Sequence, residues 1–266
     1  MRPKKHLGQH FLTAPSYSKR IADAVTAGPT DHVLEIGPGQ GALSFFLKER
    51  FPSFHLVEVD PEAIEKLKEK LGDGDFTIHH SDVMKFDFGI AGFPLHVVGN
   101  LPYSIGAHII KKTLLYGNDI KSGTFMVQRE VAERIAAKPH TKQNGFLTIF
   151  CGFFGEPKIL FHVPPGAFFP RPNVDSSVFQ VIVKDNLCAK LDREKWVDYF
   201  GFVSRGFLMR RKMLVNVLGD TPQKRAILGS NLEKIGVSVT ARPEDLGPEE
   251  WLSLYKEHYG INDCTE

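Results

Sequence analysis

Short apolar strands alternate with helical segments through the first half of the chain, and this alternation limits the fold more than any other feature. The predicted strands are "HVLEIGPG" (32–39), "FHLVEVD" (54–60), "FTIHHSDVM" (76–84), "LHVVGN" (95–100) and "GTFMVQ" (123–128). The predicted helices are 42–50, 61–71, 108–116 and 129–137. Strands and helices in alternation form a parallel, doubly wound sheet that binds ligands at the carboxyl ends of its strands. The sequence therefore predicts an α/β fold with a site at that edge.

The pattern changes in the second half of the chain. The segments "GFLTIFCGFF" (145–154) and "SSVFQVIVK" (176–184) are predicted strands with no helix between them, so we expect an antiparallel pair that finishes the sheet. A proline-rich loop (162–177) lies between them, and later patterns are helical. We expect a sheet domain over 1–188 and a small all-helical domain over 189–266.

Composition sets the broad class of the protein. The chain has 266 residues, 42% of them hydrophobic and 24% charged, as in ordinary globular proteins. Its three cysteines have no paired spacing, which favours a reducing compartment over a disulfide or zinc framework. No signal peptide or apolar run of about 18 residues stands out. We expect a cytoplasmic monomer without a metal site or a membrane segment.

Basic residues gather in two places although the net charge is only +2. The first cluster is Arg2, Lys4, Lys5 and His6, and the second is Arg205, Arg210, Arg211 and Lys212. Local basic clusters on a nearly neutral chain are typical of a phosphate-binding face. Solvated helix surfaces explain them equally well.

A glycine-rich turn, "EIGPGQGAL" (35–43), follows the first strand. Glycines here allow a ligand to approach the backbone, and the following helix favours negative charge. A dinucleotide is one candidate, although the pattern is G-x-G-x-G rather than G-x-G-x-x-G and Pro38 stiffens the turn. S-adenosylmethionine is the other, because Glu35 suits an ammonium group better than a pyrophosphate. A tight turn without a ligand is the third interpretation.

Acidic residues stand near the carboxyl ends of the next two predicted strands. Either Glu58 or Asp60 is placed to accept hydrogen bonds from ribose hydroxyls. Asp82 is placed to accept from an adenine amino group, with Val83 beside the ring, and a turn-capping aspartate is the alternative. Together with the glycine turn, these positions predict a nucleoside site.

The fourth predicted strand ends at Asn100, and Leu101, Pro102 and Tyr103 follow it directly. An adenine amine is a poor nucleophile, because its lone pair is delocalised into the ring. The Asn100 side-chain oxygen and the Leu101 carbonyl could accept both of its N–H groups and free that lone pair. Pro102 fixes the turn, and Tyr103 can stack on a flipped base. An Asx turn beside a packed tyrosine is the alternative, but it does not explain why these residue types occur together.

Several segments resemble the ribosomal RNA adenine dimethyltransferases, most closely the bacterial KsgA type. They are "KKHLGQHFL", "EIGPGQGALS", "VEVD", "SDVMKFDF", "GNLPY", "VQREVAERI" and "PPGAFFPRPNVDSSV". The resemblance implies a Rossmann-like class I methyltransferase sheet that uses S-adenosylmethionine. The implied reaction is dimethylation of N6 of two adjacent adenosines in the 3′-terminal hairpin loop of 16S small-subunit rRNA. The implied partner is that RNA within a 30S assembly intermediate, which links the enzyme to ribosome biogenesis.

The same resemblance assigns roles to individual residues. The implied cofactor contacts are His10, Leu12, Gly37, Gly39, Glu58, Asp82 and Asn100. Phe168 is the implied second ring that sandwiches the target base with Tyr103, and the implied RNA contacts are Arg210, Arg211 and Lys212. The chain departs from the family pattern at His10 and Asn144, where many relatives have Asn and Tyr, and at Met209, Met213 and Val215, which replace polar or basic residues.

Four other functions compete with this interpretation. The same chemistry serves antibiotic-resistance enzymes that act on large-subunit RNA, and methyl transfer to 30S subunits or to protein-free 23S RNA separates the two. DNA adenine methyltransferases carry a long recognition insertion for which this chain has no room. A non-catalytic assembly factor could lose the glycine turn or Asn100, and both are present. A nicotinamide oxidoreductase needs an acid–base pair that the sequence does not offer.

Overall fold

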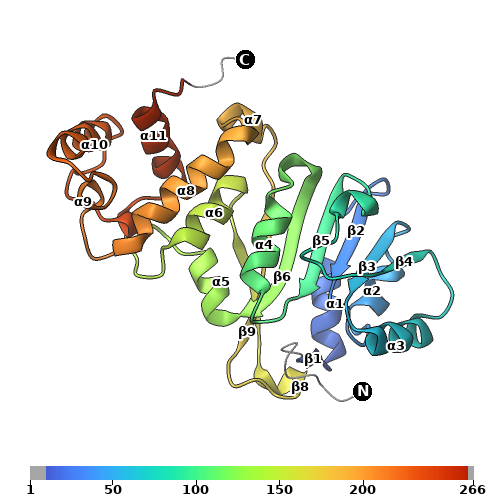
Figure 1. Ribbon diagram of the computed structural model, residues 1–266. Coiled ribbons are helices and arrows are strands. Elements are labelled where there is room, and N and C mark those ends of the chain that lie inside the picture. Colours follow the sequence, from blue (N-terminus) through green and yellow to red (C-terminus); the bar gives the residue numbers. More distant parts are fainter. Residues whose placement is uncertain (1–9, 263–266) are drawn as a thin grey trace. The chain divides into compact units, whose positions relative to one another are not determined.

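The structure is a computed structural model that describes residues 10–262 (Figure 1). They divide into a sheet unit, which runs to Ala132 and resumes over Pro157–Val183, and a helical unit, formed by Glu133–Glu156 and the chain from Lys184 onward. The helical unit thus contains a segment that the sequence analysis assigns to the sheet. Arg2, Lys4, Lys5, His6 and Cys264 lie outside the described residues.

One mixed sheet forms the centre of the sheet unit, with strand order β4-β3-β2-β5-β6-β9-β7. Its strands are β2 (His32–Ile36), β3 (Phe54–Glu58), β4 (Phe76–His80), β5 (Leu95–Asn100), β6 (Ile120–Gln128), β7 (Lys158–Val163) and β9 (Ser176–Ile182). The strands from β4 to β6 pair in parallel, whereas β9 is antiparallel to both β6 and β7. The predicted α/β class and the antiparallel end of the sheet are confirmed.

The prediction of a strand over 145–154 is wrong, because this segment is helix α6 (Phe146–Phe154) of the helical unit. Every residue from Thr148 to Phe154 is buried, so the run has no polar face that would reveal a helical period. Thr148 Oγ1 accepts a hydrogen bond from the Gly145 amide (3.0 Å) and starts the helix. The strand that pairs with β9 is instead β7, which the sequence analysis missed.

Helices α1 (Pro15–Ala24), α2 (Ser44–Lys48) and α3 (Pro61–Leu71) share one hydrophobic core with the sheet. Within this core, Ile21 of α1 and Leu67 of α3 are buried together with strand residues such as Phe54 and Leu56. On β2, Val33 belongs to this core. Helix α4 (Gly106–Leu114) packs against β6.

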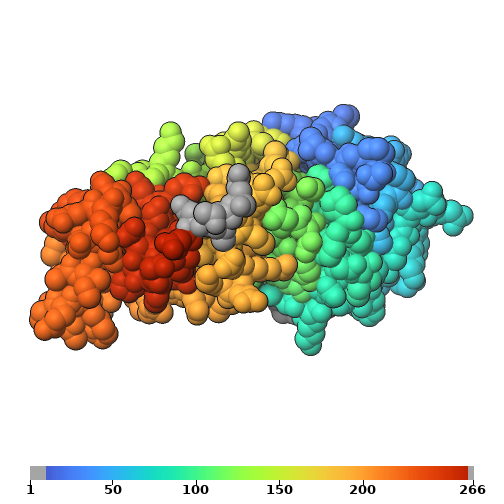
Figure 2. Space-filling view, turned by 90° about the horizontal axis from the view of Figure 1, so that it is seen from above, coloured from blue at the N-terminus to red at the C-terminus, as the bar shows by residue number. Residues whose placement is uncertain are grey.

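A short antiparallel ribbon joins two distant segments of the sheet unit. Strand β1 (Phe11–Leu12) pairs with β8 (Phe168–Phe169), and the Thr13 amide continues the pairing to the Ala167 carbonyl (2.8 Å). Figure 1 shows β1 and β8 next to each other, and in Figure 2, which is seen from above, other blue residues of the N-terminal part of the chain lie beside yellow ones. Arg20 of α1 lies over a ring of β7, with its guanidinium carbon 3.9 Å from the Phe161 ring centre. The ribbon fixes the beginning of the described chain against the sheet unit.

The helical unit is held together by close helix packing. Its helices include the C-terminal half of α5 (Arg129–Ile135), α6, α7 (Leu187–Lys190), α8 (Trp196–Gly206), α9 (Leu214–Leu218), α10 (Pro222–Lys234) and α11 (Pro248–Tyr259). A Cβ at Gly206 would lie 2.3 Å from the Trp251 ring, so only glycine allows α8 to lie this close to α11. The fully buried Asn144 donates to the carbonyls of Glu244 (2.8 Å) and Leu246 (2.9 Å). These bonds give a structural role to an asparagine that departs from the family pattern. Within residues 10–262, no helix is long and apolar enough to cross a membrane.

Candidate active site

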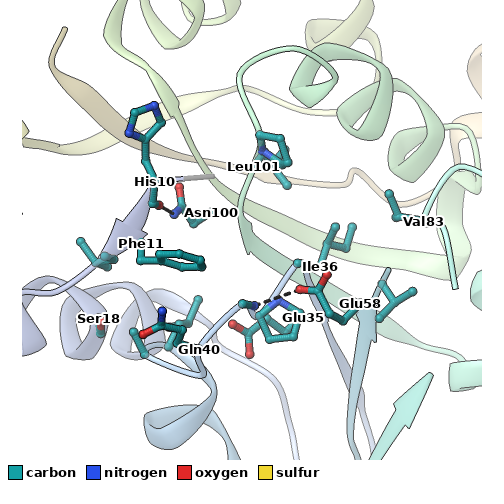
Figure 3. A pocket seen from close by; sticks show the side chains of 18 of the residues that line it. His10, Phe11, Ser18, Glu35, Ile36, Gln40, Glu58, Val83, Asn100 and Leu101 are labelled. Atoms are coloured by element: carbon teal, nitrogen blue, oxygen red, sulfur yellow. Dashed lines mark hydrogen bonds between the residues drawn. The ribbon is translucent and has the colours of Figure 1, made fainter. Parts of the chain in front are cut away.

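A cavity of about 750 Å³ opens at the carboxyl ends of β2, β3 and β5 (Figure 3). Strand β2 lies between the other two, which makes this the point where the strand order reverses. Open α/β sheets bind their ligands at such a point. The cavity is lined by β1, the glycine turn and the ends of β3, β4 and β5, where the predicted nucleoside-site residues lie.

Three glycines make the turn possible. Gly37, Gly39 and Gly41 have φ angles of 63°, 55° and 70°, a region that strongly favours glycine. A Cβ at Gly41 would lie 2.7 Å from Leu67, and one at Gly39 would lie 3.1 Å from the Phe11 ring. Figure 3 shows Phe11 pointing into the same space as Glu35 and Asn100. Phe11 is not among the residues predicted from the sequence, although it stands between the two family positions His10 and Leu12.

Of the two acidic candidates at the end of β3, Glu58 lines the cavity. Its side chain is 6% exposed, with Oε2 accepting from the Gly39 amide (3.1 Å) and Oε1 accepting from the Val59 (2.8 Å) and Asp60 (2.9 Å) amides. Asp60 instead caps α3 by accepting from the Glu62 amide (3.1 Å). Of the two candidates for the ribose, only Glu58 lines the cavity, and its ribose-binding role stays a prediction.

We expect Glu58→Ala to weaken cofactor binding by about 1.5–3 kcal/mol, because a hydrogen bond to a charged group is worth that much. Titration calorimetry with S-adenosylmethionine measures the change. The Asp60→Ala variant is the matched control, since it removes a neighbouring carboxylate that does not line the cavity. Unchanged affinity in Glu58→Ala would remove Glu58 from the site.

Glu35 lies at the end of β2, below the glycine turn. It is 2% exposed, and among the described residues its Oε2 has no hydrogen-bond partner. Burial raises the pKa of Glu35 to about 8, Ser44 and Lys70 oppose this shift, and the Glu58 charge adds to it. A buried carboxyl with an unpaired oxygen in a cavity fits the ammonium group of a methionine moiety.

This pKa makes cofactor binding depend on pH. A nearby ammonium favours the ionised carboxylate, so the cofactor must displace a proton from Glu35 at any pH below about 8. We expect cofactor affinity to rise between about pH 6 and about pH 8, and calorimetry in buffers of different ionisation enthalpy should show proton release. The Glu35→Gln variant should show neither effect. The same affinity change in that variant would contradict the assignment.

The stability of the protein should follow the opposite course. The pKa of Glu35 in the folded protein lies above its ordinary value of 4.5. Its contribution to stability is therefore complete below about pH 4.5 and is lost as pH rises toward 8. The wild type should accordingly lose stability relative to Glu35→Gln over this range.

The residues after β4 also line the cavity. Asp82 Oδ1 accepts from the Met84 amide (2.9 Å), which holds the carboxylate at the turn, and Val83 beside it is 9% exposed. Both residues line the cavity. The predicted adenine-binding role of Asp82 stays a prediction.

Asn100, Leu101, Pro102 and Tyr103 also line the cavity. Asn100 Nδ2 donates to the His10 carbonyl (3.0 Å), and the Tyr103 hydroxyl shares a hydrogen bond with Ser176 (3.0 Å). Among the described residues, no hydrogen bond ends on the Leu101 carbonyl, whereas the Pro102 carbonyl accepts from the Ile105 and Gly106 amides. The turn thus leaves the Leu101 carbonyl as an acceptor for a ligand. Ser176, the partner of the Tyr103 hydroxyl, is not among the site residues predicted from the sequence.

Phe168 lies in the hydrophobic core, although the resemblance implies that it stacks on the target base. Its ring is 5% exposed and belongs to the core that contains Leu12, whereas Phe169 is 63% exposed. Neither ring is among the residues that line the cavity. Phe168 therefore offers no free face to a base in this conformation, and its implied stacking role stays a prediction.

His10, which directly precedes β1, and Leu12 of β1 both line the cavity. Leu12 is 6% exposed and belongs to the core. The His10 ring turns away from Glu35 and Glu58, as Figure 3 shows, and stacks on Tyr103. Their predicted cofactor contacts stay predictions.

The basic cluster of the helical unit separates into two parts. Arg210 Nη2 donates to the carbonyls of Lys142 and Asn144 (both 2.8 Å), and its Nε lies 3.7 Å from Glu244. Arg211 and Lys212 are exposed, and they line a depression with Arg225. Among the described residues, no side-chain hydrogen bond or ion pair involves Arg211 or Lys212. Arg210 is thus bonded within its own unit, and the RNA contacts that the resemblance implies for the three residues stay predictions.

Residues 10–262 contain no group of three or more His, Cys, Asp and Glu side chains arranged to hold a metal ion.

Two curated bacterial proteins are similar to the chain over most of its length. Ribosomal RNA small subunit methyltransferase A of Chromobacterium violaceum is 39% identical over 254 residues, which cover 95% of this chain and 94% of the relative. The protein of the same name from Alcanivorax borkumensis is 36% identical and covers 95% and 89%.

Two solved structures share the fold. A dimethyladenosine transferase from Plasmodium falciparum superposes with a TM-score of 0.81 at 23% identity, over 95% of this chain and 98% of that one. The 23S rRNA methyltransferase ErmE superposes with a TM-score of 0.72 at 26% identity, over 94% and 99%. The family described as ribosomal RNA adenine dimethylase matches residues 1–259. By this match and by its bacterial relatives, the chain belongs to the ribosomal RNA adenine dimethylase family.

Proposed function

We propose that this enzyme uses S-adenosylmethionine to dimethylate N6 of two adjacent adenosines in the 3′-terminal hairpin loop of 16S rRNA. The substrate is a 30S assembly intermediate in the cytoplasm, and the enzyme acts as a monomer. One observation carries the proposal: the Asn100 amide is held at the cavity beside a Leu101 carbonyl that accepts no hydrogen bond from the described residues. Two acceptors at one strand end match the two N–H groups of an adenine amine.

The residues of the cavity fit the cofactor. Glu35 offers an unpaired buried oxygen for an ammonium group, Glu58 offers a carboxylate for the ribose, and the turn around Gly37 brings backbone close to the methionine part. When bound, S-adenosylmethionine supplies a methyl group activated by its sulfonium.

The protein groups act on the other reactant. The Asn100 oxygen and the Leu101 carbonyl accept hydrogen bonds from the two N–H groups of the amine, which pulls the nitrogen toward tetrahedral geometry and frees its lone pair. Tyr103 offers its ring to the flipped base, while burial raises the pKa of its phenol and keeps it neutral. Proximity and fixed dipoles lower the barrier, and the methylated amine loses its extra proton to solvent only after the transfer, so a strong general base is not required.

The helical unit supplies phosphate contacts in this proposal. We expect the Arg211→Ala/Lys212→Ala double variant to weaken 30S binding, with the slope of log K against log salt falling by about one per lost contact. Cofactor affinity should not change. The matched control is Arg210→Ala, which should lower the melting temperature without changing the slope, because Arg210 bonds to its own unit. A slope that is unchanged in the double variant and reduced in Arg210→Ala would reverse the assignment.

A second candidate is dimethylation of large-subunit RNA, which the fold similarity to ErmE favours. The small-subunit names of the bacterial relatives favour 16S RNA, at the higher identity of 36–39%. Tritiated methyl transfer to 30S subunits that lack the modification, compared with protein-free 23S RNA, decides between them. We expect incorporation into the 30S subunit, and selective labelling of 23S RNA would overturn the proposal.

A further inference from the structure

His10 contacts both ends of the proposed adenine site. Its carbonyl accepts from Asn100 Nδ2 (3.0 Å), and its ring stacks on Tyr103 with centroids 5.4 Å apart and planes inclined by 25°. Its Nδ1 lies 2.8 Å from the Pro170 carbonyl oxygen. Figure 3 shows the ring directed away from Glu35 and Glu58, although His10 occupies a family cofactor position. The side chain is thus directed toward the adenine site rather than toward the ribose and ammonium positions.

The contact with the His10 carbonyl determines which way the Asn100 amide faces. A backbone carbonyl only accepts hydrogen bonds, so the amide atom that meets it must be the NH₂ group. The Asn100 oxygen is then on the other branch of the amide, available to accept from a substrate amine. A flipped amide would place two acceptors against each other and turn a donor toward the amine. The His10 carbonyl therefore selects the orientation that the chemistry requires.

The His10 side chain holds that carbonyl in place. Because the Pro170 carbonyl only accepts, His10 Nδ1 carries the proton and donates to it. The adjacent pairing of Phe11 with Phe169 connects the same two segments. The His10 ring is held by Tyr103 and by the Pro170 carbonyl, and these two contacts restrict the position of the His10 backbone carbonyl.

We infer that His10 is a positioning residue for methyl transfer, and that it acts through Asn100. The inference rests on the proposed function, because it gives the Asn100 oxygen the task of accepting from the adenine amine. It assigns the His10 side chain to the adenine site instead of the cofactor. It also predicts which substitutions are tolerated. Asparagine carries Nδ2 on Cγ, where histidine carries Nδ1, so His10→Asn can keep the bond to Pro170.

The test is a double-mutant cycle on single-turnover methyl transfer at saturating cofactor. We expect His10→Ala to slow transfer about tenfold, the scale of one lost hydrogen bond, and His10→Asn to stay within about threefold of the wild type. In an Asn100→Ala background, His10→Ala should change the remaining rate less than about twofold, because the group it positions is absent. An equal loss in both backgrounds, or an equal loss in His10→Asn and His10→Ala, would overturn the inference.

Two further measurements separate this inference from the proposed function. The Asn100 side-chain amide, assigned by its loss in Asn100→Ala, should exchange slowly in NMR spectra of the wild type and His10→Asn, and fast in His10→Ala. Cofactor affinity by calorimetry should be equal in all three proteins. Fast exchange in the wild type, or a cofactor affinity lost in His10→Ala with transfer unchanged at saturation, contradicts the role of His10. A wild type with the expected exchange that methylates no RNA contradicts the proposed function alone.

Discussion

Asn100→Ala is expected to slow methyl transfer roughly 10²–10³-fold, the scale seen when one fixed partner of a reacting group is removed. The variant loses the side-chain oxygen that accepts from the adenine amine, while the Leu101 carbonyl remains. The protein should stay folded and bind 30S subunits with unchanged affinity, since Asn100 is only partly buried and its side chain donates to the His10 carbonyl rather than to a core residue. Single-turnover kinetics with tritiated cofactor measure the effect.

The matched control for this prediction is Asn173→Ala, which removes an exposed asparagine from the loop before β9. Its transfer rate should equal that of the wild type. A near-normal single-turnover rate in Asn100→Ala would contradict the proposed role of the Asn100 oxygen, whichever RNA is the substrate.

Phe168→Ala is expected to lower the free energy of unfolding by about 3–5 kcal/mol, the usual cost of truncating a buried phenylalanine. The ring is 5% exposed and lies in a core with Leu12 and residues of α1, α2 and α3. Urea denaturation measures the loss. Phe169→Ala is the matched control, because that ring is 63% exposed and its removal should cost within about 0.5 kcal/mol. Similar losses in both variants would contradict the packing described for β8.

The stacking role that the resemblance implies for Phe168 needs a separate variant. Phe168→Leu keeps most of the apolar volume and removes the π-face, so stability should fall much less than in Phe168→Ala. If the ring leaves the core to stack on a base, this variant should lose about tenfold to a hundredfold in transfer, because base stacking is worth about 1–3 kcal/mol. A transfer rate within about twofold of the wild type would assign Phe168 to the core alone.

The sequence predicted the parts of the fold that have a local signal. Parallel strands that alternate with helices, Pro61 at the start of α3 and glycines at the turn after β2 each follow from backbone chemistry, and the structure confirms them. The segment 145–154 had no such signal, because it is apolar on every side. Its true strand partner, β7, pairs with β9 only through tertiary structure.

The site was predictable where strand ends converge. Glu58 and Asn100 end two strands and Asp82 follows a third, and the sheet topology brings all three to one cavity. The sequence did not show whether Glu58 or Asp60 faces the cavity, because both lie at the end of β3. Only the structure shows that Asp60 caps a helix. The roles of Arg210 and His10 depend on partners far away in sequence, so no local pattern revealed them.

The central claim is tested most directly by the modified nucleoside itself. Ribosomal RNA from 30S subunits that lack the modification is incubated with the enzyme and labelled cofactor, digested and analysed by mass spectrometry, and the label is mapped on the RNA. The account predicts N6,N6-dimethyladenosine at two adjacent positions in the 3′-terminal hairpin loop of 16S rRNA, and none with Asn100→Ala. Label on another base or on ribose, or an equal yield with Asn100→Ala, would contradict it.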